Sequence, residues 1–294
     1  MERFTYARPR DVEEAVALLS APGVRSRVLA GGTDLLILTH EQPDLCDQLV
    51  DVSLLPELHL IARDGNRVTI GAAASFSEVM ESPIVNETAP LLVEACHQVG
   101  AVQIRNMGTL GGNVANAAAC ADSLPALICL DAVAKVLTPG GAREWTVADL
   151  IVRPNRTQIP AGGLLVTLSY EVPAPGSRGA FVKLGRRNAM AISRLTVAAL
   201  GRLDAMKQIV EARLVPGSAT PQIRRFASVE NLLIGRAPDL PLLEEAGQLA
   251  IAEVARIAGR RWSSEFKEPA LASMVVHALR EVFMPDLAAG GMAA

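Results

Sequence analysis

At the start of the chain, apolar and polar positions alternate between helical and extended spacing. Asp11 can cap a helix over residues 12–19, where apolar side chains recur every three or four positions. Residues 27–30 form an apolar run that predicts a strand, residues 34–41 have the pattern of an amphipathic helix, and residues 49–53 predict a second strand. This alternation predicts a small α/β unit.

The next segment has a hairpin pattern that continues into helices. Asp64-Gly65 is a turn signal between two extended runs, residues 59–62 and 67–73. Ser75-Phe76-Ser77-Glu78 has the spacing of a capping box, so a helix is expected to begin there. Apolar residues at helical spacing then predict one longer helix over residues 83–98.

The second half of the chain divides at a break in composition. Residues 133–138 and 164–171 predict two strands, separated by a loop that begins with Pro139-Gly140-Gly141. Residues 173–176 are Pro-Ala-Pro-Gly, which indicates a domain boundary. Beyond it, strands are predicted at 180–184, 194–203 and 208–215 and helices at 240–258 and 267–283. The order of these elements indicates an α+β unit, and the Gly/Ala tail at 288–294 is expected to be frayed.

Composition excludes several classes of protein. The 294 residues are 50% hydrophobic and 20% charged, so the chain can bury a large core and is not expected to be disordered. Aromatic residues make up 3%, and 28 basic against 31 acidic residues give a net charge of −3, which disfavours a nucleic-acid partner. Each long apolar run is interrupted before it could span a membrane, at Asp34, Asp131 and Glu171.

The cysteines and the missing motifs narrow the chemistry further. Cys46, Cys96, Cys120 and Cys129 fit neither a disulfide scaffold nor the spacing of a metal or iron–sulfur site. The histidines are scattered, and the sequence contains none of the serine-hydrolase, zinc-protease, P-loop or Rossmann motifs. The start of the chain does not resemble a secretory signal peptide. We therefore expect a cytoplasmic protein with reduced thiols and no metal ligands of its own.

Two glycine-rich segments carry the candidate chemistry. Ala30-Gly31-Gly32-Thr33-Asp34 follows an apolar run directly, and Gly108-Thr109-Leu110-Gly111-Gly112-Asn113 lies in the middle of the chain. Glycines permit positive φ and let successive N–H groups converge on an anion. Either segment alone could be an ordinary tight turn, but the pair indicates a diphosphate cradle. Neither contains Lys or Arg, which fits a permanently bound cofactor better than a transferred phosphate.

These segments also resemble a known family. Residues 28–35 (Val-Leu-Ala-Gly-Gly-Thr-Asp-Leu) and 103–113 are similar to the two flavin-binding signatures of the FAD-binding medium subunits of molybdenum hydroxylases. That family includes bacterial xanthine dehydrogenase, carbon monoxide dehydrogenase and nicotinate dehydrogenase, and residues 260–264 look most like the xanthine dehydrogenase branch. The resemblance covers nearly the whole chain.

The resemblance implies an α+β fold in three parts. The first two form a FAD-binding domain of the vanillyl-alcohol oxidase (PCMH) type, with one subdomain at residues 1–57 and the other at 58–176. A carbon monoxide dehydrogenase flavoprotein C-terminal-like α+β domain follows at residues 177–287, before the tail.

The resemblance also implies which residues contact FAD. The residues expected around the diphosphate and ribityl chain are Arg27, Val28, Leu29, Ala30, Gly31, Gly32, Thr33, Asp34 and Leu35. The second wall of the cradle is implied to be Thr109, Gly111, Gly112 and Asn113, with Asn116 and Asp122 toward the ribose and adenine. The remaining contact positions are Leu165, Lys183 and, near the isoalloxazine ring, Ile192.

The function implied by the resemblance is electron transfer. In such complexes a large molybdopterin-binding subunit hydroxylates the substrate, a small subunit carries [2Fe–2S] clusters, and FAD passes electrons to NAD or another acceptor. This chain contains no motif for molybdopterin or for a cluster, so those cofactors are expected on partner subunits. The alternative is a self-contained flavin reductase similar to UDP-N-acetylenolpyruvoylglucosamine reductase, although no general acid is evident beside the flavin signatures. The substrate, the stoichiometry and the acceptor (NAD, quinone or ferredoxin) stay open.

One basic cluster has two interpretations. Lys183, Arg186 and Arg187 together would usually form a solvated surface patch. The resemblance instead makes Lys183 a flavin contact. Because we expect Lys183 to lie outside the apolar core, its replacement by alanine is expected to leave the fold intact.

Overall fold

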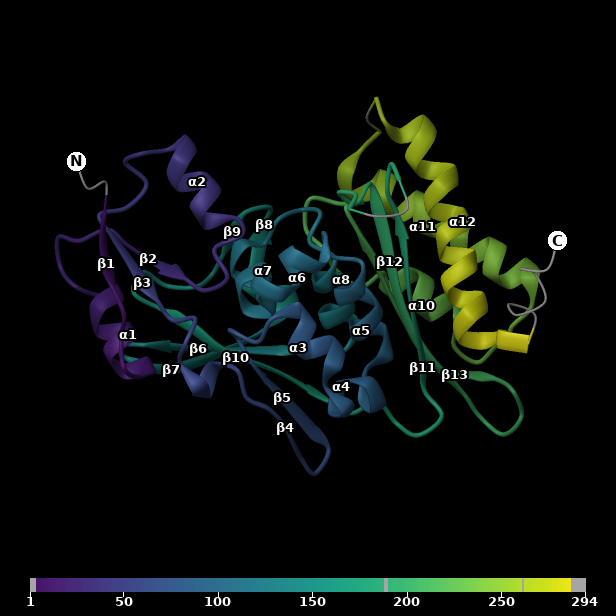
Figure 1. The fold of residues 1–294 in the computed structure, drawn as a ribbon. Coiled ribbons are helices and arrows are strands. Elements are labelled where there is room, and N and C mark those ends of the chain that lie inside the picture. The colour runs from purple at the N-terminus through teal and green to yellow at the C-terminus, as the bar shows by residue number, and fades with distance from the viewer. Residues whose placement is uncertain (1–3, 188–189, 261, 287–294) are drawn as a thin grey trace.

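The computed structural model describes residues 4–187, 190–260 and 262–286, so the expected tail at 288–294 lies outside the described residues. Three larger sheets follow one another along the long axis of the molecule (Figure 1). A three-stranded sheet lies at the N-terminal end, a five-stranded sheet in the middle and a second three-stranded sheet at the C-terminal end. Helices pack on these sheets, which confirms the expected α+β class.

The N-terminal unit is built around a parallel sheet with the strand order β1-β3-β2. Its elements are β1 (Thr5–Ala7), α1 (Val12–Leu19), β2 (Ser26–Leu29), α2 (Leu35–Glu41) and β3 (Gln48–Asp51). The side chain of Asp11 accepts a hydrogen bond from the N–H of Glu14, which confirms the expected helix cap. Strand β1 has only three residues, too few for a periodic pattern, and was not predicted.

The five-stranded sheet is antiparallel, with the order β4-β5-β10-β6-β7. Its strands are β4 (Ile61–Asp64), β5 (Arg67–Gly71), β6 (Val133–Thr138), β7 (Gly141–Thr146) and β10 (Leu164–Glu171). The expected loop after Pro139 is wrong in part, because the Pro139-Gly140 turn closes a hairpin between β6 and β7. The rest of that segment holds α9 (Val147–Leu150), β8 (Ile151–Arg153) and β9 (Arg156–Thr157).

A layer of short helices lies between the five-stranded sheet and the C-terminal sheet (Figure 1). These helices are α3 (Phe76–Glu81), α4 (Pro83–Thr88), α5 (Pro90–His97), α6 (Val102–Met107), α7 (Leu110–Asn116) and α8 (Ser123–Cys129), and the short helix η1 (Pro56–Leu58) precedes β4. The capping box of Ser75 and Glu78 is present as expected. The single helix expected over residues 83–98 is wrong. Pro90 begins α5, and Ala89 before it has φ −146°, outside the helical region.

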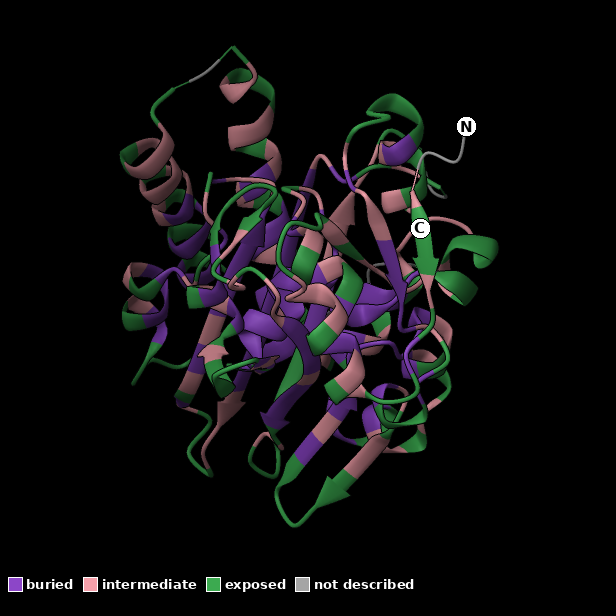
Figure 2. Ribbon diagram, turned by 90° about the vertical axis from the view of Figure 1, so that its left-hand side faces the viewer, coloured by how far each residue is buried: buried purple, intermediate pink, exposed green. Residues whose placement is uncertain are grey.

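The C-terminal unit is an antiparallel sheet, in the order β11-β12-β13, packed against helices. Its elements are β11 (Arg178–Leu184), β12 (Leu195–Leu203), β13 (Ile209–Gly217), α10 (Ala227–Leu233), α11 (Leu240–Ala258) and α12 (Ser264–Phe283). All were predicted within a few residues except α10. This unit has its own apolar core, whereas the core of the middle sheet includes residues of β12 and β13 as well. Figure 2 shows the buried residues gathered in the interior of the molecule. The two units therefore share buried surface.

An ionic cluster adds to the contact between the two units. Arg225 pairs with Asp131 at 3.0 Å and with Glu230 at 2.9 Å, and Arg213 pairs with the same Asp131 carboxylate at 2.9 Å. Asp131 follows α8 and adopts φ +51°, so its carboxylate reaches both arginines of the C-terminal unit. No helix in the described part of the chain is long and apolar enough to cross a membrane.

Candidate cofactor site

The first glycine-rich segment is a turn between β2 and α2, as expected. A Cβ atom on Gly31 would lie 1.8 Å from the carbonyl oxygen of Met107, so the turn packs directly against the backbone at the end of α6. Gly32 has φ +70°, a conformation that L side chains rarely adopt. The two glycine-rich segments are therefore adjacent in space.

The second segment is the start of a helix, not the turn expected from its glycines. Thr109 caps α7, and its Oγ1 accepts a hydrogen bond of 3.0 Å from the N–H of Gly112. Gly111 packs against the end of β5, since a Cβ there would lie 2.5 Å from the carbonyl oxygen of Ala72. Gly111 thus lets α7 approach the sheet closely.

A chain of polar contacts continues from the glycine segments across α7 and α8. Asn116 donates to the Asp34 carboxylate at 3.1 Å, which joins the end of α7 to the first turn. Ser123, which is fully buried, donates to the amide oxygen of Asn113 at 2.6 Å. The structure therefore brings the predicted residues of both segments into one connected region.

Asp122 joins this region to the C-terminal unit. Lys183 donates to the Asp122 carboxylate at 2.7 Å and to the Gln98 carbonyl at 2.7 Å, and the Ser193 hydroxyl donates to the other carboxylate oxygen. Burial raises the pKa of the Asp122 carboxyl, and the hydrogen bonds from Lys183 and Ser193 oppose that rise. The Lys183 side chain is only 7% exposed, so the interpretation as a solvated surface patch is wrong for this residue.

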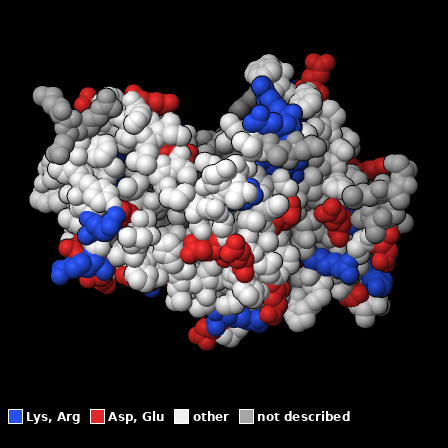
Figure 3. Space-filling model, viewed as in Figure 1, with Lys and Arg blue, Asp and Glu red and all other residues white. Residues whose placement is uncertain are grey.

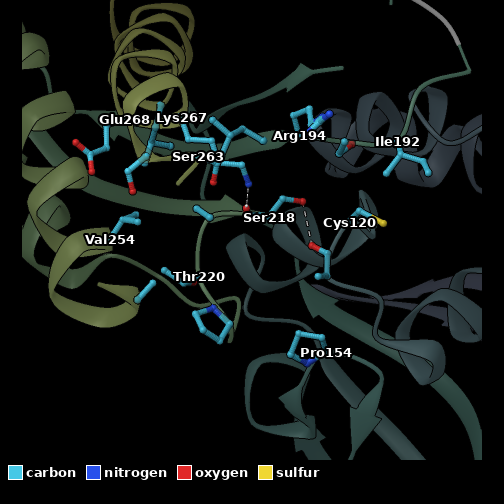
Figure 4. Close-up of a pocket in the computed structure, with 18 of the residues that line it drawn as sticks. Cys120, Pro154, Ile192, Arg194, Ser218, Thr220, Val254, Ser263, Lys267 and Glu268 are labelled. Atoms are coloured by element: carbon cyan, nitrogen blue, oxygen red, sulfur yellow. Dashed lines mark hydrogen bonds between the residues drawn. The ribbon is translucent and has the colours of Figure 1, made fainter. Parts of the chain in front are cut away.

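A cavity of about 1040 Å³ opens next to Asp122, between the α7–α8 connection and the C-terminal unit. In Figure 4 Ile192 and Cys120 lie at one side of it and Lys267 and Glu268 at the other. Ile192 is 77% exposed and is among the lining residues.

The cavity wall is basic. Its cationic lining residues are Arg186, Arg187, Arg194 and Lys267, against the single carboxylate of Glu268. Lys267 donates to the Ser218 carbonyl at 2.9 Å, and Ser218 in turn donates to the Ala119 carbonyl at 3.0 Å, as the dashed lines in Figure 4 mark. Figure 3 shows Lys and Arg side chains gathered at the upper end of the C-terminal sheet. Such a wall favours an anionic ligand.

Not every predicted residue reaches the central region. Leu165 is buried in β10, in the core of the middle sheet. The next residue, Val166, accepts a hydrogen bond at its carbonyl from the N–H of Ala72. Gly111 packs against this same Ala72, so Leu165 lies one residue from the sheet contact of α7. Arg27, Val28 and Leu29 lie in β2, pairing with β3.

Sequence reasoning missed Ser193, Ser123 and Ser218. A single serine carries no sequence pattern of its own, and only the tertiary contacts show what each hydroxyl binds.

The backbone of the first turn provides a test of whether a diphosphate-containing cofactor fits. Within residues 4–187, 190–260 and 262–286, the N–H groups of Gly32, Thr33 and Asp34 donate no hydrogen bond. Successive unsatisfied N–H groups at a turn with positive φ form a concavity that binds anions. The cradle therefore fits the diphosphate of a dinucleotide such as FAD, and no additional cation is needed.

Comparison with known proteins agrees with this geometry. Residues 2–175 match the family model described as FAD binding domain in molybdopterin dehydrogenase, and residues 180–282 match the CO dehydrogenase flavoprotein C-terminal domain. The xanthine dehydrogenase FAD-binding subunit of Escherichia coli O157:H7 is 31% identical over 291 residues, covering 98% of this chain and 97% of that protein.

Relatives from carbon monoxide dehydrogenase give the same result. The medium chain of that enzyme from Hydrogenophaga pseudoflava is 28% identical, covering 94% of this chain and 96% of that protein. A solved structure of carbon monoxide dehydrogenase from the same organism superposes with a TM-score of 0.89 at 28% identity, covering 95% of this chain and 97% of the other. These findings favour an oxidoreductase subunit over the self-contained flavin reductase.

Proposed function

Because this chain belongs to the family of FAD-binding medium subunits of molybdenum hydroxylases, we propose that it carries electrons from the [2Fe–2S] clusters of a small partner subunit, through FAD, to NAD or another acceptor. A large molybdopterin-binding partner would hydroxylate the substrate. The observation that carries the proposal is that the α7–α8 segment both contacts the first glycine turn, through Asn116 and Asp34, and lines the basic cavity.

Several residues of this chain would hold the cofactor. The N–H groups of Gly32, Thr33 and Asp34 would bind the diphosphate, and Gly112 would keep the opposite wall free of side chains. Ile192 would cover the ring, since it projects into the cavity. When bound, FAD supplies the ability to accept single electrons and to release them in pairs.

The basic wall supports a dinucleotide as the acceptor. Arg186 and Arg194 have no ion-pair partner in the described part of the chain, so their charge is available to a ligand. The diphosphate of NAD would gain from this charge, whereas a neutral quinone would not. We therefore propose NAD as the acceptor, bound beside Ile192.

The apolar surface supports a partner subunit. Helix α6 buries none of its residues, and Val102, Ile104 and Met107 are each at least 40% exposed. Apolar side chains gathered on a helix of this kind are typical of an interface.

We also propose that the complex is cytoplasmic. All four cysteines are unpaired, and thiols stay reduced in that compartment.

The experiment uses the chain produced alone and together with candidate partner subunits. The isolated chain should bind FAD and, after photoreduction, be reoxidised by NAD faster than by a quinone or by ferredoxin. Arg186→Gln should slow the reaction with NAD, and Arg178→Gln, at the far end of β11, should not. A chain that binds no FAD, or that hydroxylates substrate without partners, would contradict the proposal.

A further inference from the structure

Ser193 lies at the end of the connection between β11 and β12, of which the structure describes residues 185–187 and 190–194. Its buried hydroxyl has its partner in the FAD-binding half of the chain. Its side chain donates to Oδ1 of Asp122, and the residue is 6% exposed. The preceding residue, Ile192, is 77% exposed and reaches the cavity. This hydrogen bond therefore fixes the connection to Asp122 at the residue that follows Ile192 in the cavity wall.

Other contacts join described residues of the connection to one another or to the end of β11. The N–H of Arg194 donates to the Leu184 carbonyl at 2.8 Å, which closes the base. A Cβ on Gly185 would lie 2.7 Å from the Cβ of Ala191, so the two limbs touch. Arg187 donates to the Met190 carbonyl at 2.7 Å. These contacts lie within the connection, whereas the Ser193 hydroxyl fixes it to another domain.

The carboxylate that Ser193 binds is already engaged. Its second oxygen pairs with Lys183 at 2.7 Å, and Lys183 also donates to the Gln98 carbonyl. With 7% exposure for both the Asp122 and Lys183 side chains, the pair is shielded from water. A hydrogen bond to a buried carboxylate is stronger than one between neutral groups, so the Ser193 hydroxyl is a strong contact between this end of the connection and Asp122.

We propose that Ser193 is a positioning residue for electron transfer to the acceptor. By binding Asp122 it holds Ile192, Arg186 and Arg194 at the cavity, an inference that rests on the proposed function. Without the hydroxyl the connection samples other positions, and the affinity for the acceptor falls in proportion to the fraction of chains that keep the binding position.

The test compares Ser193→Ala with the wild-type chain in two measurements. In the holoenzyme, the KM for the acceptor should rise about 5- to 20-fold while kcat changes less than about twofold. In the chain without FAD, trypsin should cleave after Arg186 and Arg187 faster by a similar factor, with no change at Arg260. Ser20→Ala is the matched control, since it removes a partly buried hydroxyl that donates to the Val16 carbonyl at 2.7 Å in the N-terminal unit, outside the cavity.

A second variant separates hydrogen bonding from packing. Ser193→Cys nearly keeps the volume but donates only weakly, so it should behave like Ser193→Ala. Wild-type behaviour of Ser193→Cys, or faster cleavage at all sites together in Ser193→Ala, would overturn the inference. If the wild-type chain bound no FAD, the proposed function would fail, but the cleavage pattern would still decide whether Ser193 holds the connection.

Discussion

Gly31 and Met107 touch through their backbones alone, because a Cβ on Gly31 would lie 1.8 Å from the Met107 carbonyl oxygen. This contact joins the turn after β2 to the end of α6, two segments that are far apart in the sequence. The N–H groups of the following residues, Gly32 to Asp34, donate no hydrogen bond within the described chain. The shape of the cradle therefore depends on the missing side chain of Gly31.

Gly31→Ala should separate the two segments. Because the nearest atoms belong to the backbone, they cannot move aside, and we expect the free energy of unfolding to fall by about 1–3 kcal/mol. Because the cradle would be displaced, FAD affinity should also fall at least about tenfold, which corresponds to about 1.4 kcal/mol of binding free energy. Urea denaturation and flavin fluorescence titration measure the two effects.

Gly140→Ala is the control for that prediction. Its added Cβ would have its nearest neighbour at 3.8 Å, an ordinary contact, so stability and flavin affinity should both stay unchanged. Equal losses in the two variants would mean that the contact with Met107 has no special importance.

Gly112 and Gly111 should respond differently to valine. A Cβ on Gly112 would meet only Thr109, at 2.6 Å from its Oγ1. The Gly112→Val variant should therefore fold, with stability lower by about 1 kcal/mol because the helix cap is weakened. It should purify without the colour of bound flavin. A Cβ on Gly111 would meet the backbone of Ala72, so Gly111→Val should lose stability first. Thermal unfolding and the flavin absorption of the purified chains distinguish the two. Normal flavin content in folded Gly112→Val would show that Gly112 does not form a wall of the cradle.

Much of this site could be predicted from the sequence, because its glycine segments are local patterns. The strand before Gly31 and the capping box at Ser75 depend only on neighbouring residues. The helical start at Thr109 was misread, because glycines favour turns unless close packing against a sheet requires them inside a helix.

The position of Lys183 could not be predicted in the same way. Its burial depends on Asp122 and Gln98, which lie 61 and 85 residues away along the chain. No pattern in the basic segment around Lys183 encodes those partners.

The cysteines should differ sharply in reactivity. Burial raises the pKa of the Cys96 and Cys129 thiols well above the usual range, and both side chains are fully buried. Cys120 is partly exposed and lines the cavity, although burial raises its pKa as well. A maleimide should therefore label Cys120 before the other cysteines. The labelling should be slow and should become faster as the pH rises. An acceptor bound in the cavity should protect Cys120 from the reagent. Mass spectrometry of the labelled peptides tests this, with Cys120→Ser as the control; labelling that persists in Cys120→Ser would contradict it.

The buried ion pair of Lys183 and Asp122 predicts an effect on stability that differs from the one expected from the sequence. Breaking a buried pair leaves an uncompensated charge, so Lys183→Met should lose roughly 3–5 kcal/mol of stability at neutral pH, and the fold should not stay intact as the sequence suggested. Burial already raises the pKa of Asp122, and without its cation the folded-state pKa should rise further. A carboxyl whose pKa is higher in the folded than in the unfolded state binds a proton on folding, so it stabilises at low pH and that stabilisation disappears as the pH rises through the folded pKa.

The difference in unfolding free energy between Lys183→Met and the wild type should therefore be smallest below the unfolded carboxyl pKa of about 4 and grow as the pH rises toward neutral. Asp122→Asn combined with Lys183→Met removes the charge and should recover most of the stability at neutral pH, but not FAD binding, since both residues are proposed contacts of the cofactor. Lys135→Met, on an exposed position of β6, is the control and should change little at any pH. A difference that does not vary with pH would show that the Asp122 carboxylate is not the unpaired charge, and the stability of this junction would then have to come from the surrounding apolar packing.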